Sequence, residues 1–164
     1  MSNAINIVVL EDNLVLQELM VDHLLKIGHR VEGVSCAEDL DDYLAQNPID
    51  ILVLDLNLPG EDGLSISKRL REAQPGLYIV MLTAKVSEKD KTLGYASGAD
   101  IYLTKPASPA EVTAAISSIE RRILLQRQQL SGLSLNLQKM QLVGTQGLVS
   151  LGSYEFAILK ALIE

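Results

Sequence analysis

The sequence predicts a doubly wound α/β domain, in which helices cover both faces of a parallel sheet of five strands. Two observations lead to this fold class. Short aliphatic segments of strand length alternate five times with longer segments of helical periodicity. The third and fourth short segments, ILVL and YIVML, are apolar almost throughout, which is typical of strands buried on both faces. We expect this domain to occupy residues 1–122.

The five expected strands are rich in β-branched and aliphatic side chains, which favour the extended conformation. They cover residues 5–10, 29–34, 50–55, 77–82 and 101–104. Parallel strands joined by helices end at the same edge of a sheet, and ligands of such folds bind at that carboxyl edge. The residues that directly follow each strand are therefore the candidates for function.

The helices are expected at residues 13–28, 36–46, 63–73, 87–98 and 108–129, where apolar side chains recur at helical spacing. In the first of them, one apolar stripe consists of Leu16, Leu19, Met20, Leu24 and Ile27. Gly28 follows this helix, as a C-cap glycine does. Ser35 and Ser87 precede the second and fourth helices and are acceptable N-caps.

Composition excludes several classes of protein. The 164 residues carry a net charge of −7, so the whole chain does not attract nucleic acid. No apolar run approaches the roughly 20 residues that a membrane span needs, and the first residues lack the basic segment of an export signal. Cys36 is the single cysteine, so no disulfide forms within the chain. We expect a cytoplasmic protein.

Charged and polar residues follow four of the five strands. Glu11 and Asp12 come after the first, Asp55 ends the third, Thr83 follows the fourth, and Lys105 follows the fifth. Three carboxylates in one crevice repel one another unless they share protons or hold a cation. Oxygen ligands without His or Cys favour Mg²⁺. A hydroxyl and an ammonium opposite the acids suit a phosphoryl group.

These residues make the chain resemble the receiver domains of two-component response regulators, over residues 5 to 122. Receiver domains have the flavodoxin-like fold, in agreement with the predicted sheet. The resemblance depends on five motifs that occur in order on the expected elements. They are the acidic pair Glu11-Asp12, Asp55 followed by LPG, Thr83 followed by the small Ala84, Tyr102, and Lys105 before proline.

The resemblance implies that Asp55 is a nucleophile that accepts a phosphoryl group from a phosphohistidine of a sensor histidine kinase. Mg²⁺ would be held by Glu11 through water, by Asp12 and Asp55 directly, and by the backbone carbonyl of Asn57. A receiver catalyses its own phosphorylation and dephosphorylation and is not an enzyme in the usual sense.

The resemblance also assigns roles to the other strand ends. Lys105 would pair with one phosphoryl oxygen, and Thr83, followed by Ala84, would donate a hydrogen bond to another. Tyr102 would be an aromatic switch that turns inward when Thr83 moves. Half-buried packing on the sheet is a simpler role for Tyr102.

The central motif also allows other interpretations. Asp55 alone could cap the turn that LPG forms. The calcium-loop pattern fails, because Pro59 and Ile66 stand at its fifth and twelfth positions. A nucleotide- or flavin-binding enzyme of similar fold would need a glycine-rich phosphate loop, and the sequence contains no G-x-x-x-x-G-K-[ST].

The pattern of residues changes after the fifth expected helix. After a linker at 123–131, residues 132–164 give three short β-like runs near 133–137, 140–143 and 147–151. Gly144 and Gly147 flank the last turn, and a helix follows with Ser153 as N-cap and Glu155 in its first turn. This segment resembles the amino-terminal part of the winged-helix effector domain of OmpR/PhoB-type regulators. We expect that domain to be incomplete here, with DNA contacts made by residues outside this chain.

Such regulators dimerise through the fourth helix, fifth strand and fifth helix, using salt bridges between acids and arginines. Here Ala96 and Ile101 stand where acids are usual, and Ala115 stands where arginine is usual. Ala107 replaces the phenylalanine that commonly follows the Lys-Pro pair. A homodimer through this face would therefore lack its usual ion pairs.

The sequence thus predicts a Mg²⁺-dependent response regulator that controls a DNA-binding domain. The alternative is a shortened receiver that acts as a protein-interaction module without DNA binding. The full open reading frame separates these two functions, because a winged helix needs further residues with a basic recognition helix.

Overall fold

The computed structural model describes residues 4–84, 96, 98–131, 134–136, 138–144 and 147–163. The helix expected at 87–98 lies outside this part of the chain, except for Ala96 and Gly98. The chain divides into two units, Met1–Glu120 and Arg121–Glu164, and each unit is described by itself.

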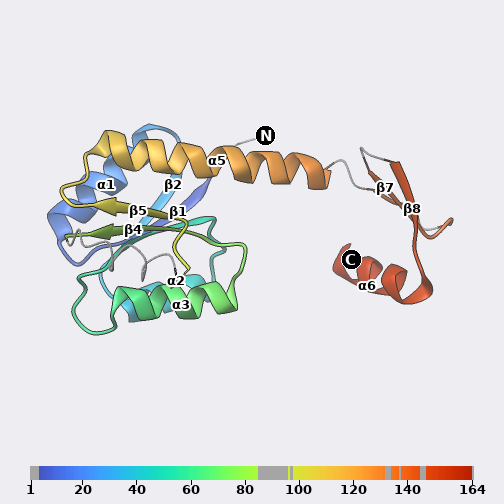
Figure 1. The fold of residues 1–164 in the computed structure, drawn as a ribbon, viewed down its shortest axis with the longest axis horizontal. Coiled ribbons are helices and arrows are strands. Elements are labelled where there is room, and N and C mark those ends of the chain that lie inside the picture. The colour runs from blue at the N-terminus through green and yellow to red at the C-terminus, as the bar shows by residue number, and fades with distance from the viewer. Residues whose placement is uncertain are drawn as a thin grey trace. The chain divides into compact units, whose positions relative to one another are not determined.

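The first unit contains the predicted parallel sheet (Figure 1). The strand order is β2-β1-β3-β4-β5, and every neighbouring pair is parallel. The strands are β1 (Asn6–Leu10), β2 (Arg30–Val34), β3 (Ile51–Asp55), β4 (Tyr78–Thr83) and β5 (Ile101–Thr104). This confirms the predicted fold class, because the first strand lies inside the sheet and the chain winds outward from it in both directions.

Helices cover the two faces of this sheet. Figure 1 shows α2 and α3 on one face, and α1 and α5 on the other. The bounds are α1 (Leu14–Lys26), α2 (Ala37–Leu44), α3 (Gly63–Ala73) and α5 (Pro109–Ser131). Residues 123–131, expected as a linker, continue the helix α5. No helix in the described ranges is both long and apolar enough to cross a membrane.

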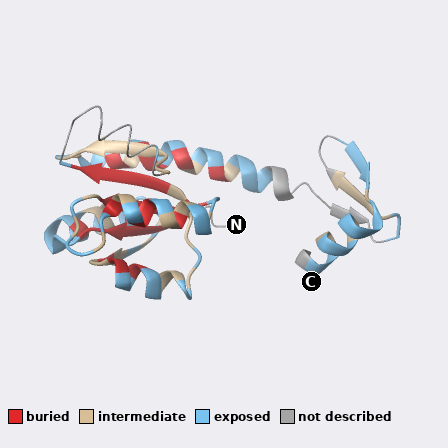
Figure 2. Cartoon of the chain, turned by 60° about the horizontal axis from the view of Figure 1, so that its bottom comes forward, coloured by how far each residue is buried: buried red, intermediate tan, exposed pale blue. Residues whose placement is uncertain are grey.

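The core lies on both faces of the sheet, because side chains of a strand alternate between its faces. Figure 2 shows buried residues concentrated in the strands of the first unit. Leu52 and Leu54 of β3 belong to the cluster that includes Ile66 and Leu70 of α3. All five residues of β3 are buried, including Asp55 at its end. The rigid middle of the sheet therefore positions that carboxylate.

The helix ends confirm some predicted caps and correct others. Gly28 follows α1 with a φ of 101°, which a residue with a side chain rarely adopts. The N-cap of α2 is Cys36 rather than Ser35, and it makes no side-chain capping bond. Glu38 and Asp39 in the first turn instead provide negative charge near the N–H groups at this end.

The apolar stripe predicted on α1 is only partly buried. Leu24 is fully buried, whereas Leu16 and Leu19 have exposed fractions of 41% and 55%. Gln17 lies seven residues before Leu24 and is buried with it. The face of α1 that meets the sheet is therefore rotated away from the apolar stripe and includes a polar amide.

The second unit contains a three-stranded antiparallel sheet of order β6-β7-β8, followed by one helix. The elements are β6 (Ser134–Asn136), β7 (Gln141–Gly144), β8 (Gly147–Ser150) and α6 (Ser153–Ile163). This confirms the predicted small sheet and helix. Ser153 is the first residue of the helix rather than its cap, and the Glu155 carboxylate accepts a hydrogen bond from the Gly152 N–H over 2.9 Å.

Candidate functional site

Three carboxylates meet at the carboxyl edge of the parallel sheet. Glu11 and Asp12 follow β1, and Asp55 is the last residue of β3. Each carboxylate offers an oxygen that lies within 4.8 Å of the other two. Glu11 and Asp55 are buried, while Asp12 is exposed. The structure thus brings together the three acids that the sequence placed at separate strand ends.

Hydrogen bonds of the ladder type continue past the ends of the strands and hold the site residues in place. The Glu11 N–H donates to the Val34 carbonyl over 3.1 Å, and the Lys105 N–H donates to the Thr83 carbonyl over 2.6 Å. Since these bonds belong to the sheet, the site shares the rigidity of the core.

Lys105 bridges the two buried acids. Its Nζ lies 2.7 Å from Glu11 Oε2 and 2.9 Å from Asp55 Oδ2. The remaining oxygens accept backbone N–H groups, Glu11 Oε1 from Asn13 over 3.1 Å and Asp55 Oδ1 from Asn57 over 3.0 Å. Each buried carboxylate is therefore held at both of its oxygens.

Burial and neighbouring charges shift two pKa values in this site. Burial raises the pKa of the Glu11 carboxyl, and the charge of Asp55 acts in the same direction, against the hydrogen bonds from Lys105 and Asn13. Burial lowers the pKa of the Lys105 ammonium, but its hydrogen bonds to Glu11 and Asp55 outweigh this, so the net shift is upward. Lys105 therefore stays charged at neutral pH.

The donor set fits a hard divalent cation. Three carboxylates and one ammonium leave the cluster with a formal charge of −2 when all four groups are ionised. All candidate ligands are oxygens, which suits Mg²⁺ better than a softer metal. Because one carboxylate is exposed, the cluster is open to solvent on the side of Asp12.

The other predicted site residues lie on β4 and β5. Thr83 ends β4 and is buried, and Ala84 after it is exposed. In the register of the sheet, Asp55 pairs with Leu82, so Thr83 lies one residue beyond the partner of Asp55. Tyr102 of β5 is half-buried and packs against the core cluster on the α2 and α3 face.

Contacts at the start of α3 fix the end of the loop that follows Asp55. Gly63 begins α3 so close to the loop that a Cβ there would lie 2.9 Å from the Asp55 carbonyl oxygen. The Asp62 carboxylate caps α3 by accepting from the Leu64 N–H over 3.2 Å. These contacts keep the chain that follows Asp55 close to the end of β3.

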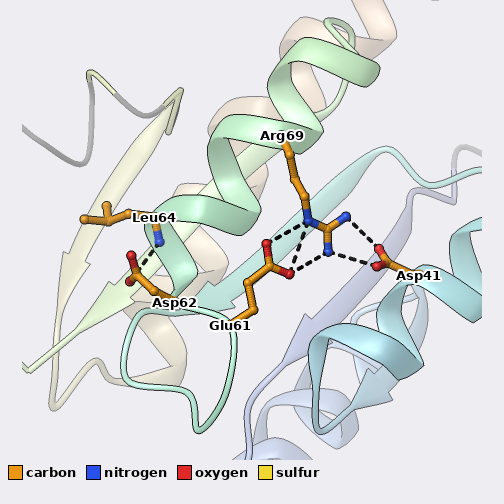
Figure 3. Close-up of polar contacts among 5 residues, drawn as sticks. All are labelled: Asp41, Glu61, Asp62, Leu64 and Arg69. Atoms are coloured by element: carbon orange, nitrogen blue, oxygen red, sulfur yellow. Dashed lines mark hydrogen bonds and ion pairs between the residues drawn. The ribbon is translucent and has the colours of Figure 1, made fainter.

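An arginine connects this loop to two helices (Figure 3). Arg69 of α3 donates to both oxygens of Asp41 on α2 over 2.8 and 3.0 Å. It also donates to Glu61 in the loop, with a shortest distance of 2.9 Å. The hydrogen bonds to Glu61 and Asp41 raise the pKa of Arg69. This network orients the loop, but partly exposed ion pairs stabilise the fold only modestly.

Sequence reasoning missed three residues with ordered polar contacts, two near the carboxyl edge of the sheet and one, Arg71, at the amino edge, where β4 and β5 begin. They are Gln17, whose amide is buried under α1, Arg69, and Arg71, which donates to Asp100 and to the carbonyls of Pro75, Leu77 and Gly98. Gln17 carried one signal, because it is the polar residue at heptad spacing from the buried Leu24. The acidic partners Asp41 of Arg69 and Asp100 of Arg71 are 28 and 29 residues away in sequence, so no local pattern indicated these pairs.

An apolar cavity of about 380 Å³ adjoins the acidic edge. Glu11 and Lys105 form its polar end, and side chains of α1, of the end of β4, of the β5–α5 loop and of the start of α5 form its walls. The walls include Leu16, Leu19, Met20, Ala107 and Val112. The exposed leucines of α1 therefore surround a hollow beside the candidate site.

The fold and the site together define a class: a doubly wound α/β domain with an acidic cluster and a lysine at the carboxyl edge of its sheet. Residues 7–117 match the response regulator receiver domain. The chain belongs to this family, as the receiver domain of a two-component response regulator.

The chain is similar to transcriptional regulatory proteins of known identity. It is 34% identical over 160 residues to the virulence transcriptional regulatory protein PhoP of Salmonella typhi, covering 96% of this chain and 71% of that protein. It is 39% identical over 126 residues to the transcriptional regulatory protein BaeR of an Escherichia coli O6:H1 strain, covering 77% of this chain and 52% of that protein.

A solved structure supports the fold of the whole chain. The response regulator DrrB, an OmpR/PhoB homologue of Thermotoga maritima, aligns with a TM-score of 0.65 and 23% identity, over 97% of this chain and 72% of that one. At this identity the likeness concerns the fold alone. The match to the receiver domain and the similarity to PhoP and BaeR confirm the family resemblance predicted from the strand-end motifs, together with its OmpR/PhoB type.

Proposed function

We propose that Asp55 accepts a phosphoryl group from a phosphohistidine of a sensor histidine kinase, in a Mg²⁺-dependent transfer that controls a transcription-regulating domain. The observation that carries this proposal is the cluster in which Glu11, Asp12 and Asp55 converge and Lys105 contacts Asp55. The carboxylates of Glu11 and Asp12 and the ammonium of Lys105 surround the Asp55 carboxylate, and the cluster is open to solvent on the side of Asp12. Phosphoryl transfer requires such positioning and charge around the nucleophile.

In the proposed reaction, a carboxylate oxygen of Asp55 attacks phosphorus and forms a new P–O bond. The P–N bond to the donor imidazole breaks, and its electron pair returns to the imidazole nitrogen. The Asn57 N–H and the Lys105 ammonium orient the Asp55 carboxylate before attack. This orientation places the nucleophile without a conformational search.

Mg²⁺ would be held by Glu11 through water, by Asp12 and Asp55, and by the backbone carbonyl of Asn57, and it would neutralise charge on the transferring group. After transfer, Lys105 would pair with one phosphoryl oxygen. Thr83 would donate to another, and Ala84 would leave room for the group. Tyr102 would act as the switch that follows Thr83.

The kinase would approach over the apolar face beside the site. The leucines of α1 are exposed next to the cavity that ends at Glu11 and Lys105, and exposed apolar surface of this kind marks protein contacts. Any binding of DNA would be through residues outside this chain, and a role in transcription is supported by the names of PhoP and BaeR, which are transcriptional regulatory proteins. A homodimer of the receiver would gain little from Ala115, whose exposed fraction is 7%.

The first test uses a small phosphodonor and mass spectrometry. We expect a single phosphoryl adduct that requires Mg²⁺, because Lys105 leaves the cluster with a formal charge of −2, which would repel the incoming phosphoryl group. Asp55→Asn should remove the adduct, whereas Asp42→Asn, at an exposed acid of α2, should keep it. An undiminished adduct in Asp55→Asn would contradict the assignment of the phosphorylation site.

A further inference from the structure

Gln17 places a side-chain amide inside the protein next to the first acid of the site. It comes from the first turn of α1, has an exposed fraction of 9%, and lies between the ends of β1 and β2. Its Nε2 is 2.8 Å from the Glu11 carbonyl oxygen and 2.8 Å from the Val34 carbonyl oxygen. Both partners are acceptors only, so the nitrogen of the amide must face them.

These bonds complete the backbone bonding of Glu11. Its N–H donates to the Val34 carbonyl over 3.1 Å, and its carbonyl accepts from Gln17. β2 ends at Val34, so the ladder between the strands stops here and the amide provides the next donor. The Gln17 side chain, which comes from a helix, thus donates the hydrogen bond to the Glu11 carbonyl that the backbone N–H of a further strand residue would donate.

Gly33 of β2 leaves the space that this amide occupies. A Cβ at position 33 would lie 2.7 Å from the Oε1 and 2.9 Å from the Cδ of Gln17. Such contacts are too close to persist, so a side chain there would displace the amide. Glycine inside a strand usually weakens it, and this close approach accounts for it here.

We infer that Gln17 is a positioning residue for the metal site: it holds the backbone of Glu11 so that the carboxylate faces Asp12 and Asp55. The inference rests on the proposed function. Side chains that orient metal ligands commonly change metal affinity when they are replaced, although they do not contact the metal. The Glu11 carboxylate is itself tied to Asn13 and Lys105, so a shift of its backbone pulls it against those bonds.

The test is a double-mutant cycle on Mg²⁺ affinity, measured by calorimetry on the full chain. Gln17→Ala should weaken Mg²⁺ binding about tenfold, the lower end of the range for groups that orient ligands. Gly33→Ala, which keeps Gln17 but displaces its amide, should weaken binding in the same direction. In the double variant the second change should add nothing, because the amide that it would displace is already gone.

Leu24→Ala is the matched control, since it removes a fully buried side chain of the same helix away from the site. It should lower the midpoint of urea unfolding and leave the Mg²⁺ affinity unchanged. If Gln17→Ala does not fold, Gly33→Ala still tests the inference, because it retains every side chain of the site.

The inference is overturned if wild-type chain binds Mg²⁺ and Gln17→Ala or Gly33→Ala binds it equally well. It is also overturned if the two changes add, because Gly33→Ala would then act through the strand rather than through Gln17. A wild-type chain that binds no Mg²⁺ would overturn the proposed function, and this inference with it.

Discussion

At the scale of single residues, the site separates its acids into two kinds. Glu11 and Asp55 are buried and share Lys105, whereas Asp12 is exposed. Lys105 offsets one of the two buried charges, and the exposed Asp12 adds a further formal charge of −1 that no ion pair of the buried acids offsets. Replacing the buried and the exposed acids should therefore change the Mg²⁺ affinity to different extents.

Asp12→Ala should weaken Mg²⁺ binding by about an order of magnitude or more, because it removes a proposed direct ligand and a negative charge. Glu11→Ala should weaken it less if that residue acts through water. Calorimetric titration of both variants measures the difference, with Asp42→Ala as the control for loss of an exposed charge. Equal losses, or no loss in either variant, would contradict the two roles.

At the scale of elements, the start of α5 is a capping box. The Ser108 Oγ accepts from the Glu111 N–H over 3.2 Å, and the Glu111 carboxylate accepts from the Ser108 N–H over 2.7 Å. The hydrogen bond from the Ser108 backbone lowers the pKa of Glu111, and that from its hydroxyl adds to the effect. The carboxylate form of Glu111 is therefore favoured in the folded state.

A lowered pKa in the folded state stabilises the protein above the ordinary pKa of glutamate and is lost as pH falls through the folded value. The stability of wild type should thus fall as pH drops below the ordinary glutamate value of 4.5. Glu111→Gln keeps the capping geometry but should lose this part of the pH dependence, while Glu111→Ala should lose the cap as well. Urea unfolding at several pH values measures both, and identical pH profiles for wild type and Glu111→Gln would contradict the assignment.

The elements also show what the sequence could predict. Aliphatic runs between turn residues placed all five strands of the first sheet within one residue at each end. The composition of β1, β3 and β4 is distinctive because these strands are almost fully buried. The rotation of α1 was not predictable from its apolar stripe. Leu16 and Leu19 remain exposed beside the site. Gln17 points inward instead, because its amide donates hydrogen bonds to the backbone carbonyls of Glu11 and Val34 at the ends of β1 and β2.

The acids and the lysine were predictable because parallel strands end at one edge, so position along the chain implied position in space. The Arg69 network was not, because it joins α2, α3 and the loop after Asp55 through contacts up to 28 residues apart. The roles of Thr83, Ala84 and Tyr102 depend on the phosphorylated state, and they stay predictions.

At the scale of the whole molecule, we expect this 164-residue chain not to bind DNA specifically, whether phosphorylated or not. Its net charge of −7 opposes the counterion release that drives binding to nucleic acid. Residues 132–164 carry two lysines and two glutamates, so this segment has no excess of positive charge. A mobility-shift titration near physiological salt measures this, with a regulator that has a complete winged-helix domain as the comparison. Specific retardation by the short chain would mean that its second unit is not part of a winged helix.

The position of Lys105 affects the stability of the unphosphorylated state. With an ammonium already seated between Glu11 and Asp55, the unphosphorylated domain carries an internal counterion and does not depend on metal to tolerate its own buried acids. A phosphoryl group on Asp55 would offer this ammonium a more negative partner in the same place. Phosphorylation would then replace the ion pair between Lys105 and the carboxylates by an ion pair between Lys105 and the phosphoryl group. Because Lys105 has an anionic partner in both states, the two states can lie close in free energy and interconvert reversibly.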